Sequence, residues 1–460
     1  MAVSQVNLRY AMGINMKKKQ GMVLLSLLIW GSGQFIVAKQ RVKGSLFFLA
    51  QVLLLGTELF TGYWLNYFAG QISDFSIRLY GGFFTKGLWG LITMGSVEGI
   101  KGDHSTILLI NGIIAFMGFI ILMGVYIVNV TDAYKQGILL DSLGRKEILK
   151  RNKLSTKKKA FPYLILMPAA IVIILIVLMP IIFSVLTAFT NYDMNHLPPA
   201  HLVDWVGFEN FTKLVSVPIW SKTFLTVLIW TIIWAVAATF STYFMGLLQA
   251  LMLSSKYVKH KGLFQAIYIL PWAIPGMISL LVFKNLLNGQ FGPFNQFLLD
   301  TGIISERIPF LTDPVLAKIS ILAVNLWMGF PTFMVMLLGV LANQEESLYE
   351  AARIDGAGKL QVFRRIKLPL LMQATAPLII MNLACNFNNF GAIYFLTGGG
   401  PTNSNLQFAG DTDILISWIY KLTLDQRMFS MAAVMNILIF LFIAVVSLWN
   451  FSRTNAFKEM

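Results

Sequence analysis

Three asparagines in an apolar run near the C-terminus have the spacing of one helix face. Asn382, Asn386 and Asn389 are four and then three residues apart, so we expect their amides on one side of a membrane helix. An unpaired amide is costly in lipid, and this side should therefore face the interior of a bundle. Neutral amides both donate to and accept from hydroxyl groups, which favours an uncharged polyol as ligand. The alternative is that they only join helices, at about 0.6 kcal/mol per hydrogen bond.

A second polar face is expected on the apolar run at residues 316–341. Its members share the three-to-four-residue spacing of one helix side. They are Asn325, Met328, Gly329 and Thr332. Pro331 should kink this helix, and Gly329 leaves room beside it. Many transporters bind substrate where helices break or kink near mid-bilayer, so the two faces together predict a substrate path.

The sharpest pattern occupies the connection 345–369. It consists of Glu350, Ala351, Ala352, Asp355 and Gly356, followed after nine residues by Ile366, Leu368 and Pro369. Ser347 stands three residues before Glu350, as in a capping box, which predicts a helix start there. Gly356 and Gly358 should end that helix, and Pro369 fits the first turn of the next one. The two alanines leave a small face that a partner protein can approach closely. A plain loop with a cap and a glycine stop is the alternative.

The composition indicates that these residues are carried by membrane helices. The chain has 460 residues, of which 57% are hydrophobic and only 12% charged, whereas charged residues reach about a quarter in soluble domains. Apolar runs of spanning length recur, and helices satisfy the backbone of such runs segment by segment. The formal charge of +15 lies in short connections rather than on one soluble face, so it indicates topology and not a nucleic-acid partner.

Eight spans are predicted, which makes the chain an all-α polytopic membrane protein. The runs are 44–65, 106–130, 160–189, 223–252, 263–287, 316–341, 370–395 and 429–451. Basic residues are concentrated at 135–159 and 256–261, which places these connections and both termini in the cytoplasm. The basic stretch 135–159 should link an N-terminal membrane module, 1–134, to a six-helix unit, 160–460.

Two segments of the N-terminal module do not fit a simple crossing. Residues 21–37 are apolar but short, contain a Gly31-Ser32-Gly33 break and have basic residues on both flanks. We therefore expect a re-entrant or interface-lying helix rather than a ninth span. Residues 66–105 are aromatic and glycine-rich, and they should form an external segment resting on the membrane surface.

The same connection, 345–369, resembles the coupling-loop signature of binding-protein-dependent ABC importer permeases. Glu-Ala-Ala, three residues, Gly, nine residues and Ile-x-Leu-Pro are all present. The resemblance extends from about Phe161 to the C-terminus and is similar to the MalF-like branch of maltose and maltodextrin permeases, with local matches at 269–275, 386–390 and 396–401. It implies ATPase coupling by the residues of the pattern and sugar contact by the two polar faces, Cys385 included. Thr332 and Cys385 stand where that branch can offer tyrosine and phenylalanine, so another oligosaccharide, such as a raffinose-type sugar, is an alternative substrate.

The resemblance also implies an assembly. Its expected components are a second, MalG-like permease, two copies of a cytoplasmic ATPase, an extracytoplasmic sugar-binding protein and the lipid bilayer of a bacterial cell membrane. The chain has no Gly-x4-Gly-Lys-Ser/Thr loop, so ATP and Mg should bind to the partner ATPase and no cofactor to this chain. The mechanism implied is alternating access.

Two other function classes have less support in the residues. An ion-coupled secondary transporter normally needs membrane-buried carboxylates or histidines, and Glu58 lies outside the six-helix unit. A membrane enzyme needs a catalytic or metal constellation, but the four histidines are scattered and the one cysteine, Cys385, excludes an intramolecular disulfide. Neither pattern points to a catalytic site.

Overall fold

The structure is a computed structural model that describes residues 17–62, 81–99, 102–143, 165–255 and 257–453. All elements assigned in these ranges are helices, which confirms the predicted all-α fold. The chain divides into two compact units, Met1–Gly207 and Phe208–Met460. The third predicted span therefore belongs to the first unit. The basic linker 144–159 falls outside the described residues, so its role stays a prediction.

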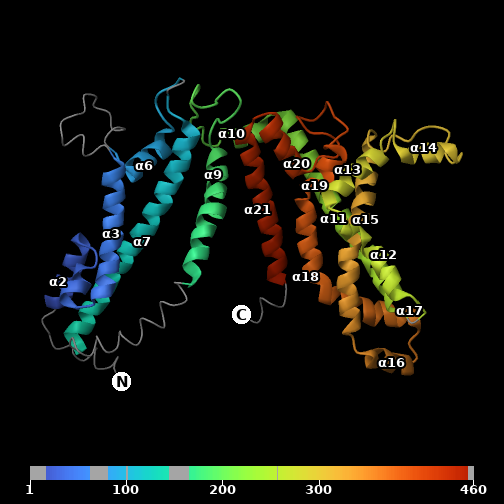
Figure 1. Ribbon diagram of the computed structural model, residues 1–460, viewed down its shortest axis with the longest axis horizontal. Coiled ribbons are helices and arrows are strands. Elements are labelled where there is room, and N and C mark those ends of the chain that lie inside the picture. The colour runs from blue at the N-terminus through green and yellow to red at the C-terminus, as the bar shows by residue number, and fades with distance from the viewer. Residues whose placement is uncertain (1–16, 63–80, 100–101, 144–164, 256, 454–460) are drawn as a thin grey trace. The chain divides into compact units, whose positions relative to one another are not determined.

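The first unit contains three long helices and several short ones (Figure 1). In chain order they are α2 (Lys17–Leu28), the π-helix η1 (Gly33–Val37), α3 (Arg41–Thr61), α6 (Phe83–Thr93), α7 (Ser105–Leu143) and a helix at Ile165–Thr187 that includes η2 (Ile173–Leu178) and α9 (Met179–Thr187). The described part of the predicted surface segment contains α6, which packs against α7. A Cβ at Gly87 would lie 2.4 Å from the Ala115 Cβ, so this contact requires glycine. Glu58 of α3 accepts hydrogen bonds from the first N–H groups of α6, which gives this carboxylate a structural role.

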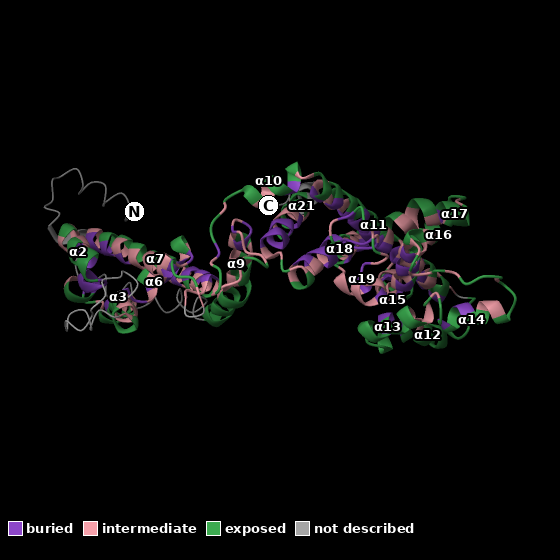
Figure 2. Cartoon of the chain, turned by 90° about the horizontal axis from the view of Figure 1, so that it is seen from above, coloured by how far each residue is buried: buried purple, intermediate pink, exposed green. Residues whose placement is uncertain are grey.

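The second unit is a bundle around the long helix α11 (Pro218–Ser254). Its other helices are α10 (Glu209–Ser216), α12 (Lys261–Ala273), α13 (Gly276–Leu286), α14 (Pro293–Asp300), α15 (Pro314–Ala342), α16 (Glu346–Ile354), α17 (Lys359–Val362), η3 (Phe363–Lys367), α18 (Leu368–Phe387), α19 (Phe390–Thr397), α20 (Leu415–Tyr420), η4 (Lys421–Asp425) and α21 (Phe429–Arg453). Buried residues follow the inner sides of α11, α15, α18 and α21, while their outer sides are exposed (Figure 2). Such apolar outer sides suit a bilayer.

Helices α11 and α15 approach each other closely at the centre of this unit. A Cβ at Gly246 would lie 2.7 Å from the Phe333 Cβ and 2.8 Å from the Met334 backbone nitrogen. Around this contact, Tyr243, Phe333 and Leu371 form a fully buried cluster that also holds α18. The close approach fixes the position of α15, which carries Asn325, Gly329 and Thr332 of the predicted polar faces.

The predicted number of spans is not confirmed. Six described helices are long and apolar enough to cross a membrane, or seven if the bent pair α12 and α13 forms one span. This pair, predicted as one span, turns by 89° because Pro275, which lacks a backbone N–H, stands at the start of α13. The eighth predicted span coincides with α21, in which Phe429–Val445 forms a shorter apolar stretch.

Candidate substrate cavity and coupling loop

The predicted seventh span is broken where its asparagines lie. Helix α18 ends at Phe387 and α19 begins at Phe390, so the prediction of one continuous helix over 370–395 was wrong. The Asn389 side chain caps the second helix by accepting a hydrogen bond from the Ala392 N–H at 3.2 Å. An asparagine cap offers an alternative to helical continuation, and the break gathers polar groups inside the bundle.

A polar cavity of about 470 Å³ opens beside this break. It is lined by Thr242, Asn325, Gly329, Thr332, Asn382, Cys385, Asn386, Asn388, Asn389, Phe390 and Gly391. Seven of the eight residues predicted to contact substrate are in this wall. The eighth, Met328, is not, because it packs against the apolar cluster around Trp234.

Sequence reasoning missed four residues of the wall, Thr242, Asn388, Phe390 and Gly391. The last three became part of the cavity because the helix breaks. Thr242 belongs to α11 and fills the space expected beside Gly329, where a Cβ would lie 2.8 Å from the threonine Cγ2. That space is therefore a helix contact rather than room for a ligand.

The asparagines of the wall have different roles. The buried Asn386 amide donates to Thr239 Oγ1 at 3.0 Å and to Asn382 Oδ1 at 2.9 Å, and its oxygen accepts from Asn389 Nδ2 at 3.4 Å. Asn386 therefore joins helices, which was the alternative reading of this residue type. By contrast, the amides of Asn325 and Asn388 have no hydrogen-bond partner among the described residues. Such amides can receive a ligand.

The chemistry of the wall is neutral. None of the residues that line the cavity is charged, and Phe390 is the only aromatic residue among them. Its ring is stacked on Tyr394, with centroids 4.7 Å apart. Amide and hydroxyl groups beside one ring suit an uncharged, hydroxyl-rich ligand, whereas a cation or anion would be left without a counter-charge. Within the described residues, no group of three His, Cys, Asp or Glu side chains could hold a metal.

The pattern at 345–369 forms a short exposed helix with a well-defined end. Helix α16 ends at Ile354, and Gly356 follows with φ +86°. The Gly356 N–H donates to the Arg353 carbonyl and the Ala357 N–H to the Ala352 carbonyl, both at 3.0 Å. These two bonds form a Schellman motif, which confirms the predicted glycine stop.

The predicted capping box is wrong. Helix α16 begins at Glu346 with Glu345 as its N-cap and no side-chain cap, and Ser347 donates instead to a Glu345 carboxylate oxygen at 3.5 Å. Glu350 is consequently in the second turn rather than the first. It is exposed, as are Ala351 and Asp355, while Ala352 is half-buried.

The second half of the pattern continues directly into α18. Helical structure runs without a break from Lys359 to Phe387, so α17, η3 and α18 form one continuous segment. Pro369 lies in the first turn of α18, as predicted, and η3 widens the preceding turn. A π-turn accommodates the helical hydrogen bond that is lost because proline has no backbone N–H. Ile366 and Leu368 are half-buried, and the Lys367 ammonium lies 5.6 Å above the Tyr349 ring, which connects α16 to the base of α18.

Comparison with known proteins decides the family. Residues 243–453 match the family described as binding-protein-dependent transport system inner membrane component. Over 444 residues the chain is 38% identical to the galactooligosaccharides transport system permease protein GanP of Bacillus subtilis, covering 96% of this chain and 100% of GanP. The chain belongs to the binding-protein-dependent ABC importer permeases. This permease is also 36% identical to the maltodextrin transport system permease protein MdxF of Bacillus subtilis, over 96% of the chain and 97% of MdxF.

The fold has a solved counterpart. A bacterial ABC transporter involved in the import of the acidic polysaccharide alginate matches 65% of this permease and 96% of its own chain, with a TM-score of 0.54 and 24% identity. The family assignment makes the protein a multi-pass membrane permease and not itself an enzyme. The similarity to GanP and MdxF also covers the N-terminal module. The resemblance seen in the sequence was limited to residues 161–460 and did not include this module.

In this permease, the loop between α19 and α20 is held by a buried ion pair. The Asp413 carboxylate, fully buried, accepts from Lys421 Nζ at 2.6 Å, from the Gly410 N–H at 2.7 Å and from Ser417 Oγ at 2.8 Å. Burial raises the pKa of the Asp413 carboxyl, although Lys421 and the two other donors favour the charged form.

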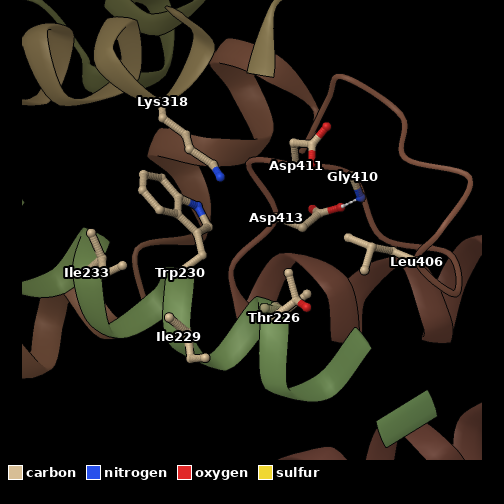
Figure 3. A pocket seen from close by; sticks show the side chains of 10 residues that line it. Thr226, Ile229, Trp230, Ile233, Lys318, Leu406, Gly410, Asp411 and Asp413 are labelled. Carbon is tan, nitrogen blue, oxygen red and sulfur yellow. Dashed lines mark hydrogen bonds between the residues drawn. The ribbon is translucent and has the colours of Figure 1, made fainter. Parts of the chain in front are cut away.

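A second, smaller pocket of about 250 Å³ adjoins this loop. Figure 3 shows the Lys318 side chain extending beside the Trp230 ring, with the Asp413 carboxylate turned toward Gly410. The Lys318 ammonium lies 4.7 Å from the ring centroid, within the range of a cation–π contact. The Trp230 indole N–H donates to the Thr412 carbonyl, so the loop is attached to α11. The ion pair and this bond fix the loop that follows α19.

Proposed function

We propose that the chain is one of two permease subunits of an ATP-driven importer that moves a neutral oligosaccharide by alternating access. The observation that carries this proposal is the uncharged amide cavity at the break between α18 and α19. Discontinuous helices near mid-bilayer are a recurrent place for substrate binding in transporters. The family assignment is in keeping with this mechanism and not with ion coupling.

A galacto-oligosaccharide is the first candidate substrate and a maltodextrin the second. GanP, named for galactooligosaccharides, is the more similar of the two relatives described above, and MdxF is named for maltodextrin. Thr332 and Cys385 both line the cavity, where they offer no ring for stacking on a sugar. This wall favours hydrogen bonding to hydroxyl groups over stacking on aromatic rings.

The partners follow from the exposed helix α16. Its Leu348 and Ile354 side chains are 50% and 86% exposed, and an exposed amphipathic helix is suited to a groove on another protein. We infer that α16 docks on a cytoplasmic ATPase, present in two copies that bind ATP and Mg. A second, MalG-like permease and an extracytoplasmic sugar-binding protein complete the assembly.

A continuous helix connects the docking surface to the cavity. Lys367 contacts α16, and Asn382 and Asn386 of the same helical segment line the cavity. At 1.5 Å per residue, Lys367 and Asn386 are roughly 28 Å apart along the axis. A displacement of α16 by the ATPase can therefore reach the asparagines through one continuous helical segment.

The orientation proposed is that expected from the basic connections. Within the second unit, α16 lies at one end of the bundle, while α14 and the loop before α20 lie at the other (Figure 1). With α16 in the cytoplasm, the loop held by Asp413 faces outward toward the binding protein. The cytoplasmic location of both termini is proposed from the basic connections alone.

Uptake of labelled sugars tests the cavity. Asn325→Ala and Asn388→Ala remove the two amides without a partner in the chain, and we expect each to lower oligosaccharide uptake at least about tenfold, as for the loss of one or two substrate hydrogen bonds. The matched control is Asn285→Ala, whose exposed amide bonds only within its own helix. Cells carrying all partner subunits are supplied with labelled galacto-oligosaccharide or maltodextrin. Normal uptake of both sugars by both cavity variants would show that the substrate path lies elsewhere.

A further inference from the structure

The first membrane-associated segment of the chain folds back on itself. Helix α2 has 12 residues and η1 has 5, whereas a bilayer crossing needs about 20. Between them the chain turns at Gly31, which has φ +78°, and a Cβ there would lie 2.1 Å from the Gly44 carbonyl oxygen. Only glycine fits this turn, which lies against the start of α3.

The backbone of the turn is satisfied by side chains and not left to water. The Gly31 N–H donates to Asn129 Oδ1 at 2.9 Å, and the Trp30 N–H donates to Gln51 Oε1 at 2.9 Å. The Gly33 N–H donates to Ser26 Oγ at 3.1 Å. Asn129 and Ser26 are fully buried. Non-helical backbone is tolerated at membrane depth only where protein groups or water-filled cavities satisfy it in this way.

A buried amide cluster fixes the folded segment to α7. The Gln34 side chain accepts from Ser26 Oγ at 3.0 Å and donates to the Asn129 carbonyl at 2.9 Å. In return, Asn129 Nδ2 donates to the Ser26 carbonyl at 2.9 Å. The outer surface of the segment is apolar, with Leu24 63% and Leu28 80% exposed. Polar groups inside and apolar side chains outside are the arrangement required within lipid.

Basic residues gather at the opposite, open end of this hairpin. The Gln40 amide donates to Gln136 Oε1 at 2.9 Å, so the turn carrying Lys39 and Arg41 lies beside Lys135 of α7. None of these three cations forms a salt bridge with a described residue, and all three are exposed.

Two further cations lie at the same end. Lys19 lies 4.1 Å above the Tyr134 ring, and Lys43 pairs with Asp132 at 2.5 Å. The starts of α2 and α3 and the last turns of α7 lie at the same end of the first unit (Figure 1), and their cations form one basic edge. Among the side chains described at this edge there are five cations and one carboxylate that pairs with them, Asp132, so these side chains carry a net positive charge beside an apolar surface.

We propose that residues 17–43 form a re-entrant hairpin that enters and leaves the cytoplasmic leaflet, and that its basic edge binds anionic phospholipid headgroups through Lys39, Arg41 and Lys135. The apolar side chains hold the hairpin in the acyl region. The buried amides make the turn tolerable there, and the cations meet phosphate at headgroup depth.

Thiol accessibility tests the re-entrant path. In the chain with Cys385→Ser, single variants Gln20→Cys and Lys39→Cys are treated with a membrane-impermeant maleimide, in intact cells and in inverted vesicles. We expect both to react only in inverted vesicles, while the control Ser96→Cys reacts only in intact cells and Leu28→Cys in neither. Reaction of Gln20→Cys and Lys39→Cys from opposite sides would show a crossing. Reaction of Leu28→Cys would show a hairpin lying on the surface.

Lipid selectivity tests the basic edge. The assembled transporter is placed in nanodiscs of equal phosphatidylglycerol and phosphatidylcholine, and the lipids that remain bound are counted by native mass spectrometry. The triple variant Lys39→Gln, Arg41→Gln, Lys135→Gln should lose about tenfold in its preference for phosphatidylglycerol. The matched triple Lys39→Arg, Arg41→Lys, Lys135→Arg keeps the charge and should keep the preference. An unchanged preference in the glutamine variant would overturn the lipid site.

Discussion

Asn386 and Asn388 are two residues apart and have opposite roles. The first is buried and makes hydrogen bonds with Thr239, Asn382 and Asn389, so it positions the wall. The second is exposed at the helix break and has its amide available. Helical spacing predicted that Asn382 and Asn386 line one wall, because both lie on α18, but it missed Asn388, which lies at the helix break. It could not predict which are already paired, because Thr239 is 147 residues away along the chain.

Gly356 and the nearby Gly358 allow a matched test of the helix end, because only Gly356 has a positive φ. It has φ +86°, a conformation that costs other residues about 1–2 kcal/mol, and Val is especially unfavourable there. Gly358 has φ −68° and ψ 159°, which valine adopts readily, and neither glycine has a heavy atom near its Cβ position. We expect Gly356→Val to misplace the end of α16 and abolish uptake and ATPase stimulation, with normal membrane insertion, while Gly358→Val transports normally. Equal activity of the two variants would contradict this role for the helix end.

Among the helices, the two breaks differ in whether a helix-breaking residue marks them in the sequence. The break between α12 and α13 is marked by Pro275, although we predicted one span there because its apolar run was continuous. The break between α18 and α19 has no proline or glycine at 388 or 389. It depends on the Asn389 cap and on contacts with α11, which only the folded bundle supplies. The glycine stop after α16 was predictable because a Schellman motif is local, whereas its start was not.

The buried ion pair between Asp413 and Lys421 should contribute to the stability of the loop between α19 and α20. Lys421→Met leaves the Asp413 carboxylate buried without its counter-charge, which should lower stability by about 3 kcal/mol. Asp413→Asn/Lys421→Met should recover most of this loss, because no charge remains buried. The melting temperature of the purified complex at pH 7 measures both effects. A single variant that melts like the wild type would show that the pair contributes nothing.

The same variant should respond to pH in a defined direction. Burial raises the pKa of Asp413 in the folded state, and the loss of Lys421 raises it further. The folded chain then holds its proton at a pH where the unfolded chain, with a pKa of about 3.9, has lost it. The destabilisation of Lys421→Met should therefore grow as the pH rises and shrink when melting is measured at about pH 5 rather than pH 7. If the difference in melting temperature between Lys421→Met and the wild type grew on acidification, the pKa of Asp413 would be shifted in the opposite direction.

At the scale of the whole molecule, apolar runs predicted the order of most membrane helices, and the coupling-loop pattern predicted the family. The similarity to GanP over the full length of that protein shows that the N-terminal module belongs to the same family design. Composition could not show how this module is built, because its hairpin depends on Asn129 and Gln34, which meet only in the folded unit. The division into an N-terminal module and a six-helix unit at 160–460 stays a prediction, and residues 165–187 of the third predicted span lie in the first compact unit.

The central claim is that α16 is the contact through which a separate ATPase moves the bundle. Ile354, 86% exposed at the end of α16, can test it directly as Ile354→Cys in the Cys385→Ser chain, combined with cysteines in the groove of the partner ATPase. We expect that an oxidising crosslink forms in the assembled transporter, that it stops sugar uptake, and that reduction restores uptake. Modification of this cysteine by an impermeant reagent in intact cells, or no crosslink to any ATPase position in an active complex, would show that α16 is not this contact.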